Sequence, residues 1–205
     1  MREITATRSV LLELQEERRS LSEGYRFLDE KRMVLAGAIL DELRRYQPAA
    51  EQFHATFAAA VAALQAAAGR HGVEGLLVHP AASLDTAELE VTTRTILGVA
   101  VQQARLAGEA GEPPPGPNPS PEARACGRRF AAVLTQAVAL AAQAGNLERL
   151  GREYRRTARR ARALEDVLLP EINEAVADVS GRLEEIDREE AIRVRYAAET
   201  QGHPG

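Results

Sequence analysis

Residues 147–190 read LERLGREYRRTARRARALEDVLLPEINEAVADVSGRLEEIDREE, and they combine an arginine cluster, a proline and an acidic end in one pattern. Apolar residues recur through this stretch at spacings of mostly three, four or seven: Leu147, Tyr154, Ala161, Leu164, Leu168, Ile172, Val176, Val179, Leu183 and Ile186. That period is typical of a helix that buries one stripe against a partner. The stretch therefore predicts a long helix packed against a second one.

The arginines of this stretch lie within about four helical turns: Arg149, Arg152, Arg155, Arg156, Arg159, Arg160 and Arg162. If Leu147, Tyr154 and Ala161 form the packed stripe, then Arg149, Arg152, Arg156 and Arg159 lie about 160° away, on the outer face. Such a surface is either simply solvated, or attracted to acidic loops of another protein, or bound to RNA. RNA binding is disfavoured because aromatic residues are not interleaved with the arginines and the net charge is −4.

The composition favours long helices over a thick globular core. Of the 205 residues, 45% are apolar, yet only 4% are aromatic and none is Trp. Much of the apolar content is alanine, the best helix former, which adds little hydrophobic bulk. The Ala-rich windows at 53–69 and 130–147 also carry Thr, Gln or His, so we interpret them as faces of soluble helices and expect no membrane insertion.

A first helix is predicted from residue 8 to about residue 46. Two rows of residues spaced seven apart form the three-and-four pattern of a coiled-coil seam: Leu14, Leu21, Leu28 and Leu35, and Leu11, Arg18, Tyr25, Arg32, Ile39 and Tyr46. An ordinary amphipathic helix in a bundle is the alternative. Pro48 predicts a kink or pause near residues 46–47. An Ala-rich helix then resumes, and the glycines of GRHG, residues 69–72, predict its left-handed end.

The centre of the chain loses the helical period. Residues 90–101 are rich in β-branched side chains with glycine punctuation, and they predict one or two short strands. Residues 108–121 are rich in Pro and Gly and predict a loop. Ser120 and Pro121 then mark the start of a second long helix, expected to run to about residue 198.

These segments predict an all-α fold, a long antiparallel two-helix coiled-coil hairpin with a small, partly β central segment. The expected domains are an N-terminal coiled-coil helix at 1–70 with its kink near Pro48, a central segment at 71–121, and a C-terminal coiled-coil helix with a short tail at 122–205.

No motif for catalysis or cofactor binding is present in the sequence. The single lysine, Lys31, lies in no phosphate-binding GxxxxGK[ST] loop, and the four histidines form no HExxH motif. Cys126 is the only cysteine, so no intramolecular disulfide is possible. We therefore expect a chain that is not an enzyme and binds no cofactor or metal.

Three blocks of the sequence resemble the D subunit of V-type (A/V-type) ATPases, the central rotor stalk. The C-terminal block comprises Thr157, Arg159, Arg160, Ala163, Leu164, Glu165, Val167, Leu169 and Pro170, followed by Glu184, Glu185, Asp187, Arg188, Glu189 and Glu190. The N-terminal block comprises Thr7, Arg8, Leu11, Leu12, Leu21, Gly24, Leu28, Lys31, Arg32 and Leu35. The central block comprises Val91, Arg94, Ile96, Gly98 and Val101.

The resemblance implies a non-catalytic rotor shaft, whose rotation couples ATP hydrolysis or synthesis to H⁺ or Na⁺ transport. It implies contacts with the A and B subunits of a catalytic collar, with the F subunit, and with the C (d-type) subunit above the membrane rotor ring, on the cytoplasmic face. The candidate interface residues are Thr7, Arg8, Lys31, Arg32, Arg149, Arg152, Arg156, Arg159, Arg160 and Arg162. Pro170 is the candidate kink that would bend the shaft between its basic and acidic halves.

Two other functions remain as alternatives. One is a stand-alone coiled-coil scaffold or adaptor, which would purify alone as a homodimer. The other is a nucleic-acid-binding helical hairpin, whose binding would weaken steeply with salt.

Overall fold

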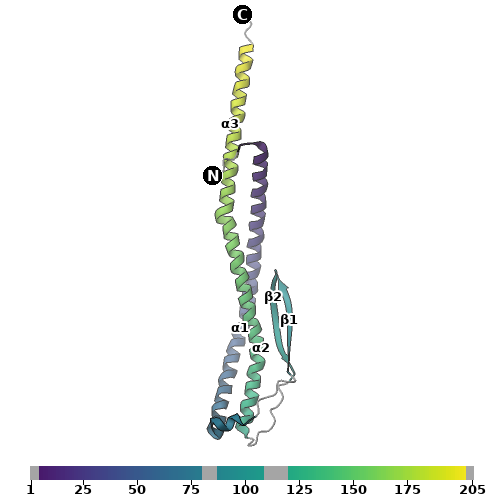
Figure 1. Cartoon of the computed structure of the whole chain (residues 1–205), viewed down its shortest axis with the longest axis vertical. Helices are drawn as coiled ribbons and strands as arrows, with labels where there is room; N and C mark the ends of the chain where they lie inside the picture. Colours follow the sequence, from purple (N-terminus) through teal and green to yellow (C-terminus); the bar gives the residue numbers. More distant parts are fainter. Residues whose placement is uncertain (1–4, 80–86, 109–119, 202–205) are drawn as a thin grey trace. The chain divides into compact units, whose positions relative to one another are not determined.

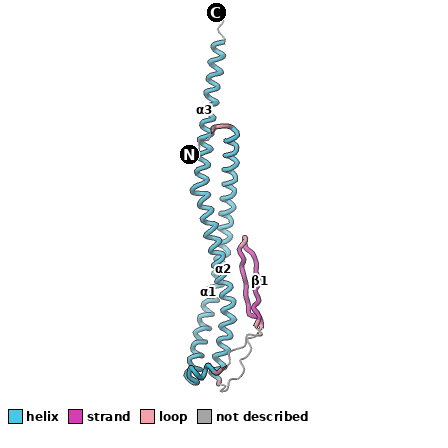
Figure 2. Tube along the Cα trace, in the orientation of Figure 1, coloured by secondary structure: helices cyan, strands magenta, loops and turns pink. Residues whose placement is uncertain are grey.

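The computed structural model describes residues 5–79, 87–108 and 120–201. The chain forms two long packed helices, and the segment that connects them in the sequence contains a small antiparallel hairpin (Figures 1 and 2). Helix α1 spans Arg8–Leu77, strands β1 and β2 span Glu88–Ile96 and Val99–Ala107, and helix α2 spans Pro121–Ala163. A π-helical turn, η1 (Leu164–Leu168), connects α2 to helix α3 (Leu169–Gln201). The predicted fold class is confirmed, whereas the predicted loop falls largely on residues 109–119, outside the described residues.

The chain divides into two compact units. The first unit comprises Met1–Arg32 and Arg155–Gly205, and the second comprises Met33–Tyr154. The long helices therefore contribute to both units, and the strands belong to the second.

In the first unit, the start of α1 runs antiparallel to η1 and α3. The predicted seam residues Leu14, Leu21 and Leu28 are half-buried, whereas Arg18 is exposed. On the partner helix Ile172, Val176 and Val179 are buried. Arg8 lies opposite Asp187, with Nη2 and Oδ1 3.4 Å apart. The seam predicted from the three-and-four spacing is thus confirmed over most of its length.

The π-helical turn changes which residues continue this seam. In η1 the N–H of Leu169 donates to the carbonyl of Leu164, five residues earlier, where an α-helix would use four. The sequence pattern assigned Leu168 to the seam, but Leu168 is 40% exposed and Leu169 is half-buried in its place. The seam assignment of Leu168 is therefore wrong by one residue, because the extra residue of the turn places Leu169 in the seam, after which Ile172, Val176 and Val179 follow as predicted.

Another seam prediction fails further along α3. Ile186 is 44% exposed, although the spacing assigned it to the packed stripe. Arg8, the first residue of α1, already lies opposite Asp187, and Figure 1 shows α3 continuing beyond the start of α1. Ile186 lies where the partner helix ends, so its apolar side chain is only partly covered.

The second unit has its hydrophobic core where the strands meet the helices. The core contains Leu35 from α1, Val99 and Val101 from β2, and Leu150 from α2. Ala38, Ile39, Ile96 and Tyr154 are partly buried around it. Leu35 is thus buried as its seam position predicted. Val99 and Val101, which alternate along β2 and so face the same side, pack into the same core.

The hairpin connects its strands through a two-residue turn. Ile96 pairs with Val99, and the ladder continues to Glu88 and Ala107. Both turn residues have positive φ, 46° at Leu97 and 85° at Gly98, as a type I′ turn requires. Since this turn twists in the same sense as the strands, it fixes the register of the hairpin. The prediction of short strands is confirmed, and the second strand extends further than the sequence indicated.

Two predictions for α1 are refined by the structure. A kink or a pause was predicted at residues 46–47, and the helix continues through Pro48 without a pause, although Pro48 donates no backbone hydrogen bond; the kink stays a prediction. Non-helical geometry is instead confined to Gly72, with φ 69° and ψ 164°, which fits the predicted left-handed glycine. The helix then continues to Leu77, beyond the end predicted at residues 69–72.

The start of α2 agrees with the sequence signal. The buried Ser120 hydroxyl accepts a hydrogen bond from the N–H of Ala123 at 3.0 Å, which makes Ser120 the N-cap. The Ser120 hydroxyl also lies 2.7 Å from the His71 ring on α1. One 18-residue window of the helical span Pro121–Tyr196 has the length and composition to cross a membrane, a criterion that helices of soluble proteins also meet.

Candidate functional site

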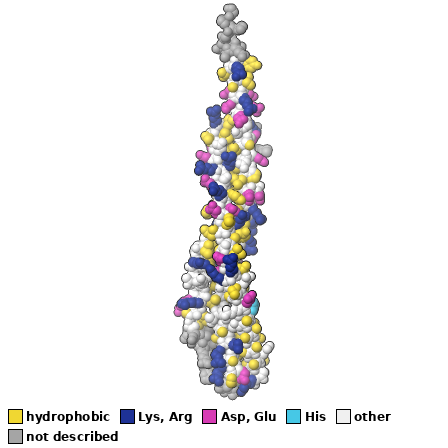
Figure 3. Space-filling model, turned by 180° about the vertical axis from the view of Figure 1, so that it is seen from behind, with side chains coloured by type: hydrophobic (Ala, Val, Ile, Leu, Met, Phe, Trp, Pro, Cys, Tyr) yellow, Lys and Arg dark blue, Asp and Glu magenta, His cyan; other side chains and the backbone are white. Residues whose placement is uncertain are grey.

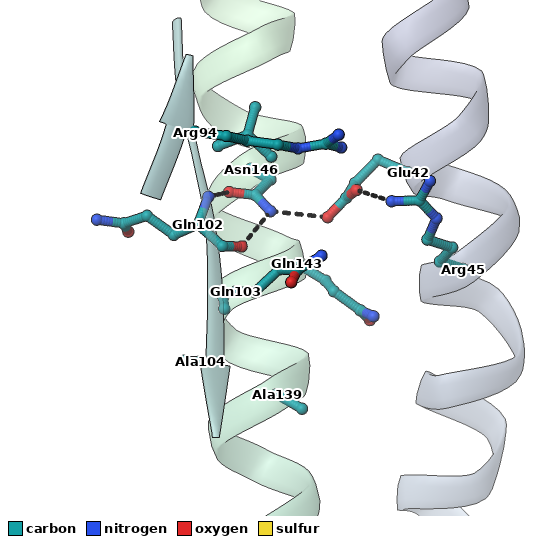
Figure 4. A pocket seen from close by; sticks show the side chains of 11 residues that line it. Glu42, Arg45, Arg94, Gln102, Gln103, Ala104, Ala139, Gln143 and Asn146 are labelled. Atoms are coloured by element: carbon teal, nitrogen blue, oxygen red, sulfur yellow. Dashed lines mark hydrogen bonds and ion pairs between the residues drawn. The ribbon is translucent and has the colours of Figure 1, made fainter. Parts of the chain in front are cut away.

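A buried network of hydrogen bonds in the second unit is built around Asn146 (Figure 4). Asn146 lies on α2 and is 1% exposed. Its Oδ1 accepts from the N–H of Gln102 at 2.8 Å, and its Nδ2 donates to the carbonyl of Gln102 at 2.7 Å. The same Nδ2 donates to Oε1 of Glu42 on α1 at 2.8 Å. One amide therefore joins a strand to both helices of the unit.

Glu42 is a buried carboxylate with two partners. Its side chain is 5% exposed, and Nη1 of Arg45 lies 3.5 Å from Oε2. Burying a charge is costly unless it is hydrogen-bonded, so the contact from Asn146 is needed for Glu42 to remain inside. Glu42 also continues the row of Leu28 and Leu35 by one more step of seven. The seven-residue spacing thus predicts that position 42 is packed, but the polar glutamate there made the position hard to recognise as buried.

Arg149 also holds the hairpin, and this corrects its predicted place on the free outer face. Its Nε donates to the carbonyl of Ala100 at 2.9 Å, and its Nη2 donates to Oδ1 of Asn146 at 2.7 Å. The arginine is half-buried as a result. Helical periodicity placed Arg149 on the side of α2 that faces away from α1. Strand β2 lies against that side, so Arg149 points away from α1 but contacts the hairpin.

Two adjoining hollows lie beside this network in the second unit, of about 160 and 370 Å³. Both are lined by Glu42, Arg45, Arg94 and Val101. Within the described residues, Arg94 makes no hydrogen bond or ion pair, and Figure 4 shows its side chain extending past Asn146. The buried Oε1 of Gln143, at the smaller hollow, accepts no hydrogen bond from the described chain. The lining combines apolar side chains with carboxylates and two guanidinium groups.

The remaining predicted arginines lie on the exposed surface. Arg152 pairs with Glu148, one helical turn earlier, with Nη2 and Oε1 2.6 Å apart. In the first unit, the five arginines between positions 155 and 162 are exposed, and none of them has a hydrogen bond or ion pair within the described residues. We call this set the arginine surface: Arg155, Arg156, Arg159, Arg160 and Arg162. Further along the unit, by contrast, Arg182, Arg188 and Arg193 each pair with an acidic residue four positions earlier.

The mixture of charges along the helices is visible on the face drawn in Figure 3, where basic and acidic side chains intersperse. The arginine surface departs from this mixture because its charges are not neutralised by neighbours in the described chain. Coulomb attraction to an acidic partner is therefore available to these five side chains and screened by salt.

The N-terminal candidates have mostly local roles. The hydroxyl of Thr7 accepts from the N–H of Val10 at 3.3 Å and caps α1. Arg8 forms its exposed pair with Asp187, Arg32 pairs with Asp29 on the same helix, and Lys31 is half-buried with a partner. These contacts explain the residues structurally, and their predicted interface role remains a prediction.

The π-helical turn is fastened to α1 within the first unit. Tyr25 on α1 is hydrogen-bonded to the Glu165 side chain in η1, and this bond raises the pKa of Tyr25 above its usual value, with burial and nearby carboxylates adding to the effect. Gly24, beside it, leaves room for Leu164, whose Cδ1 would lie 3.8 Å from an added Cβ. Pro170 is the second residue of α3, two positions after the end of η1. The candidate kink therefore coincides with a local change of helix type.

Metal ligands are not grouped in the described part of the chain, where no three His, Cys, Asp or Glu side chains come together. Polar contacts, hydrophobic packing and charged surfaces thus make up the sites that these residues offer. A model of the ATP synthase D-subunit family matches residues 10–199, a range that includes β1, β2 and both long helices.

The chain belongs to the D-subunit family of ATP synthases. It is similar to the D subunit of the V-type ATP synthase of Anaeromyxobacter sp. strain K, with 32% identity over 203 residues and 95% of each chain covered. It is also similar to the D subunit of the V-type ATP synthase of Thermotoga neapolitana, with 24% identity over 200 residues, covering 96% of this chain and 97% of the relative. The D subunit of the A-type ATP synthase of Thermococcus kodakarensis is 29% identical over 201 residues, with 94% and 92% covered.

Membership in the D-subunit family confirms the resemblance of the three sequence blocks. Their residues lie on both helices and in the hairpin, among them Leu35 and Val101, which meet in the core of the second unit. Sequence reasoning missed Asn146 and Glu42, which lie outside the three blocks. An isolated Asn in an Ala-rich helix carried no distinguishing signal, because its partner Gln102 is 44 positions away.

Proposed function

We propose that this member of the D-subunit family is the central rotor shaft of a V/A-type ATPase or ATP synthase. The observation that carries the proposal is the family match over 10–199, which covers both long helices and the hairpin. The chain would not hydrolyse ATP itself, and its rotation would couple ATP hydrolysis or synthesis in a catalytic collar to transport of H⁺ or Na⁺. As a stalk subunit it would be peripheral, on the cytoplasmic face of the membrane.

The proposed partners are the A and B subunits of the collar, the F subunit, and the C (d-type) subunit above the membrane rotor ring. The arginine surface supports a sliding contact with acidic loops of the collar, because its five guanidinium groups lack partners in the described chain. An exposed ion pair contributes only about 0–1 kcal/mol. Contacts of that strength guide position without holding the shaft in one orientation.

Pro170 and η1 support a second element of the proposal. A proline within a helix removes one backbone hydrogen bond, and a π-helical turn alters the direction of the chain locally. We propose that this region bends the shaft, so that the shaft presents a different side to each catalytic subunit. Pro170→Ala is expected to reduce the torque of a reconstituted motor, and unchanged torque and coupling would refute the role of Pro170.

Reconstitution tests the function as a whole. The chain is expected to co-purify with A, B and F subunits and to be required for ATP-driven rotation, measured by single-particle rotation of a bead on the stalk. Isolation of the native protein alone as a homodimer would favour the scaffold alternative instead. Retention on nucleic acid that falls steeply with salt would favour the nucleic-acid alternative.

Charge-neutralising variants test the arginine surface. Arg156→Gln, Arg159→Gln and Arg160→Gln combined should weaken the coupling of ATP hydrolysis to rotation. The difference in coupling between this variant and the unsubstituted protein should shrink at high salt, because salt screens the arginine charges of the unsubstituted protein. The matched control combines Arg182→Gln, Arg188→Gln and Arg193→Gln, which removes the same charge from the same unit but from paired arginines. Equal effects of the two triple variants would show that total charge, not this surface, is responsible.

A further inference from the structure

The two edges of the hairpin are not equivalent. In a two-residue hairpin the residues flanking the turn, Ile96 and Val99, exchange backbone hydrogen bonds, and every second residue from them does the same. The intervening residues point their N–H and C=O groups away from the partner strand. On β2 these outward residues include Ala100 and Gln102, and the structure shows their groups bound by Arg149 and Asn146.

The outward residues of β1 follow from the same alternation: Leu89, Val91, Thr93 and Thr95. Their backbone groups have no hydrogen-bond partner within the described residues. In Figure 1, β2 is the strand beside α2, and β1 lies on the outer side of the hairpin. One edge of the sheet is thus bound by helix side chains at Ala100 and Gln102, whereas the other presents four outward residues without a partner in the described chain.

The side chains at this open edge are also suited to an added strand. Leu89 and Val91 are 58% and 48% exposed, and they share a face of the hairpin with Leu106 and Ala104, their cross-strand partners. The strand contains no proline and no bulge, the usual features that block pairing at an edge. On the opposite face lies Arg94, a cation with no partner in the described chain.

We propose that β1 accepts an extended segment of another protein subunit of the assembly as a third strand. Backbone pairing to Leu89, Val91, Thr93 and Thr95 would provide affinity, and side chains would provide selectivity, as in other strand-addition complexes. The segment that fits alternates apolar residues, against Leu89 and Val91, with polar ones that include a carboxylate near Arg94. The partner's identity as a member of the assembly rests on the proposed function, whereas the open edge does not.

Hydrogen exchange in the assembled complex tests the inference. Amides of β1 that point outward should exchange at least tenfold more slowly in the complex of this chain with A, B and F subunits than in the isolated chain. The amide of Gln102 on β2 should change little, because its N–H already donates to Asn146. Co-purification without added protection in residues 88–96 would overturn the strand inference and leave the proposed function intact.

Proline substitutions separate the edge from the ladder. Thr93→Pro removes an outward N–H without removing a β1–β2 hydrogen bond, so the hairpin should stay folded while the assembly-dependent protection of Leu89, Val91 and Thr95 is lost. Thr93→Ala keeps the N–H and should retain that protection. If Thr93→Pro also exposes the β2 amides of the isolated chain, Val91→Pro provides the same test at another outward position. Full retention of the protection in a proline variant with a folded hairpin would overturn the proposal.

Two further outcomes address the occupant. Arg94→Gln should reduce the protection by threefold or more, and Arg105→Gln, which removes a cation already paired with Glu90, should reduce it less. If protection of residues 88–96 instead rises with concentration of the isolated chain, the occupant is a second copy and the proposal of another protein of the assembly is wrong.

Discussion

The side chain of Asn146 pairs with the Gln102 peptide as a neighbouring strand would, donating to its carbonyl at 2.7 Å and accepting from its N–H at 2.8 Å. Asn146→Ala should therefore free the outer edge of β2 and leave Glu42 without its best donor. Loss of several buried hydrogen bonds, one to a carboxylate, is expected to lower the free energy of unfolding by about 2–4 kcal/mol. Urea denaturation measures this loss.

Asn173→Ala is the matched control for that substitution. Asn173 is exposed on α3, where alanine is the better helix former, so its change should be neutral or slightly stabilising. A loss below about 0.5 kcal/mol for Asn146→Ala would contradict the anchoring role. Faster exchange of the β2 amides in Asn146→Ala than in Asn173→Ala would localise the effect to the hairpin.

The turn at Leu97 offers a stabilising substitution. Leu97 has φ 46°, a left-handed geometry that costs a leucine about 1–2 kcal/mol and an asparagine less. Leu97→Asn creates the Asn-Gly pair preferred in type I′ turns and should raise stability by roughly 0.5–1 kcal/mol. Leu97→Val is the opposing control, because a β-branched residue is disfavoured at positive φ. A destabilised Leu97→Asn chain would show that the side-chain packing of Leu97 outweighs its backbone strain.

The Tyr25–Glu165 contact predicts an alkaline dependence of stability. Because the hydrogen bond raises the pKa of Tyr25 in the folded state, its stabilisation is complete below the unfolded-state pKa, near 10, and is lost as pH rises through the folded-state pKa. Tyr25→Phe should remove this part of the pH profile and lower stability at neutral pH. Tyrosinate absorbance and thermal unfolding from pH 8 to 12 measure both effects. A profile unchanged in Tyr25→Phe would rule out this contact as the cause.

Gly181 in α3 offers a stabilising substitution in an exposed part of the helix. It is exposed, and an added Cβ meets nothing within 4 Å. Gly181→Ala should raise stability by roughly 0.5–1 kcal/mol, since alanine loses less backbone entropy in a helix. Gly145→Ala is the contrasting variant, because its Cβ would lie 3.1 Å from Nη1 of Arg149 and should offset part of that gain. Equal gains at both sites would show that Arg149 moves aside without cost.

Helical packing was readable from the sequence because it depends on local spacing. Leu21 and Leu35 on α1 and Ile172 and Val179 on α3 all lie in the packed stripe that their periodicity predicted. Each such position needs only a partner helix on one side, so seven-residue spacing is sufficient information. The N-cap at Ser120 was predictable for the same reason, since its bond reaches only three residues along the chain.

The candidate site was less predictable because its contacts join distant segments. Arg149 was assigned to an outer face by helical rotation, yet Ala100, 49 positions earlier, supplies its acceptor. No periodicity in α2 encodes where β2 will lie. Glu42 shows the same limit, because a packed position is recognisable as such only when its residue is apolar.

The π-helical turn has a consequence for how this chain tolerates changes of length. Leu164 and Leu169 occupy successive seam positions five residues apart, so the two helices joined there are out of phase by one residue. Deleting Asp166 would let an unbroken α-helix form, and each residue after it would turn by about 100° relative to those before. The turn thus accommodates one residue more than a continuous α-helix would, and removing it would rotate the residues of α3 about the helix axis.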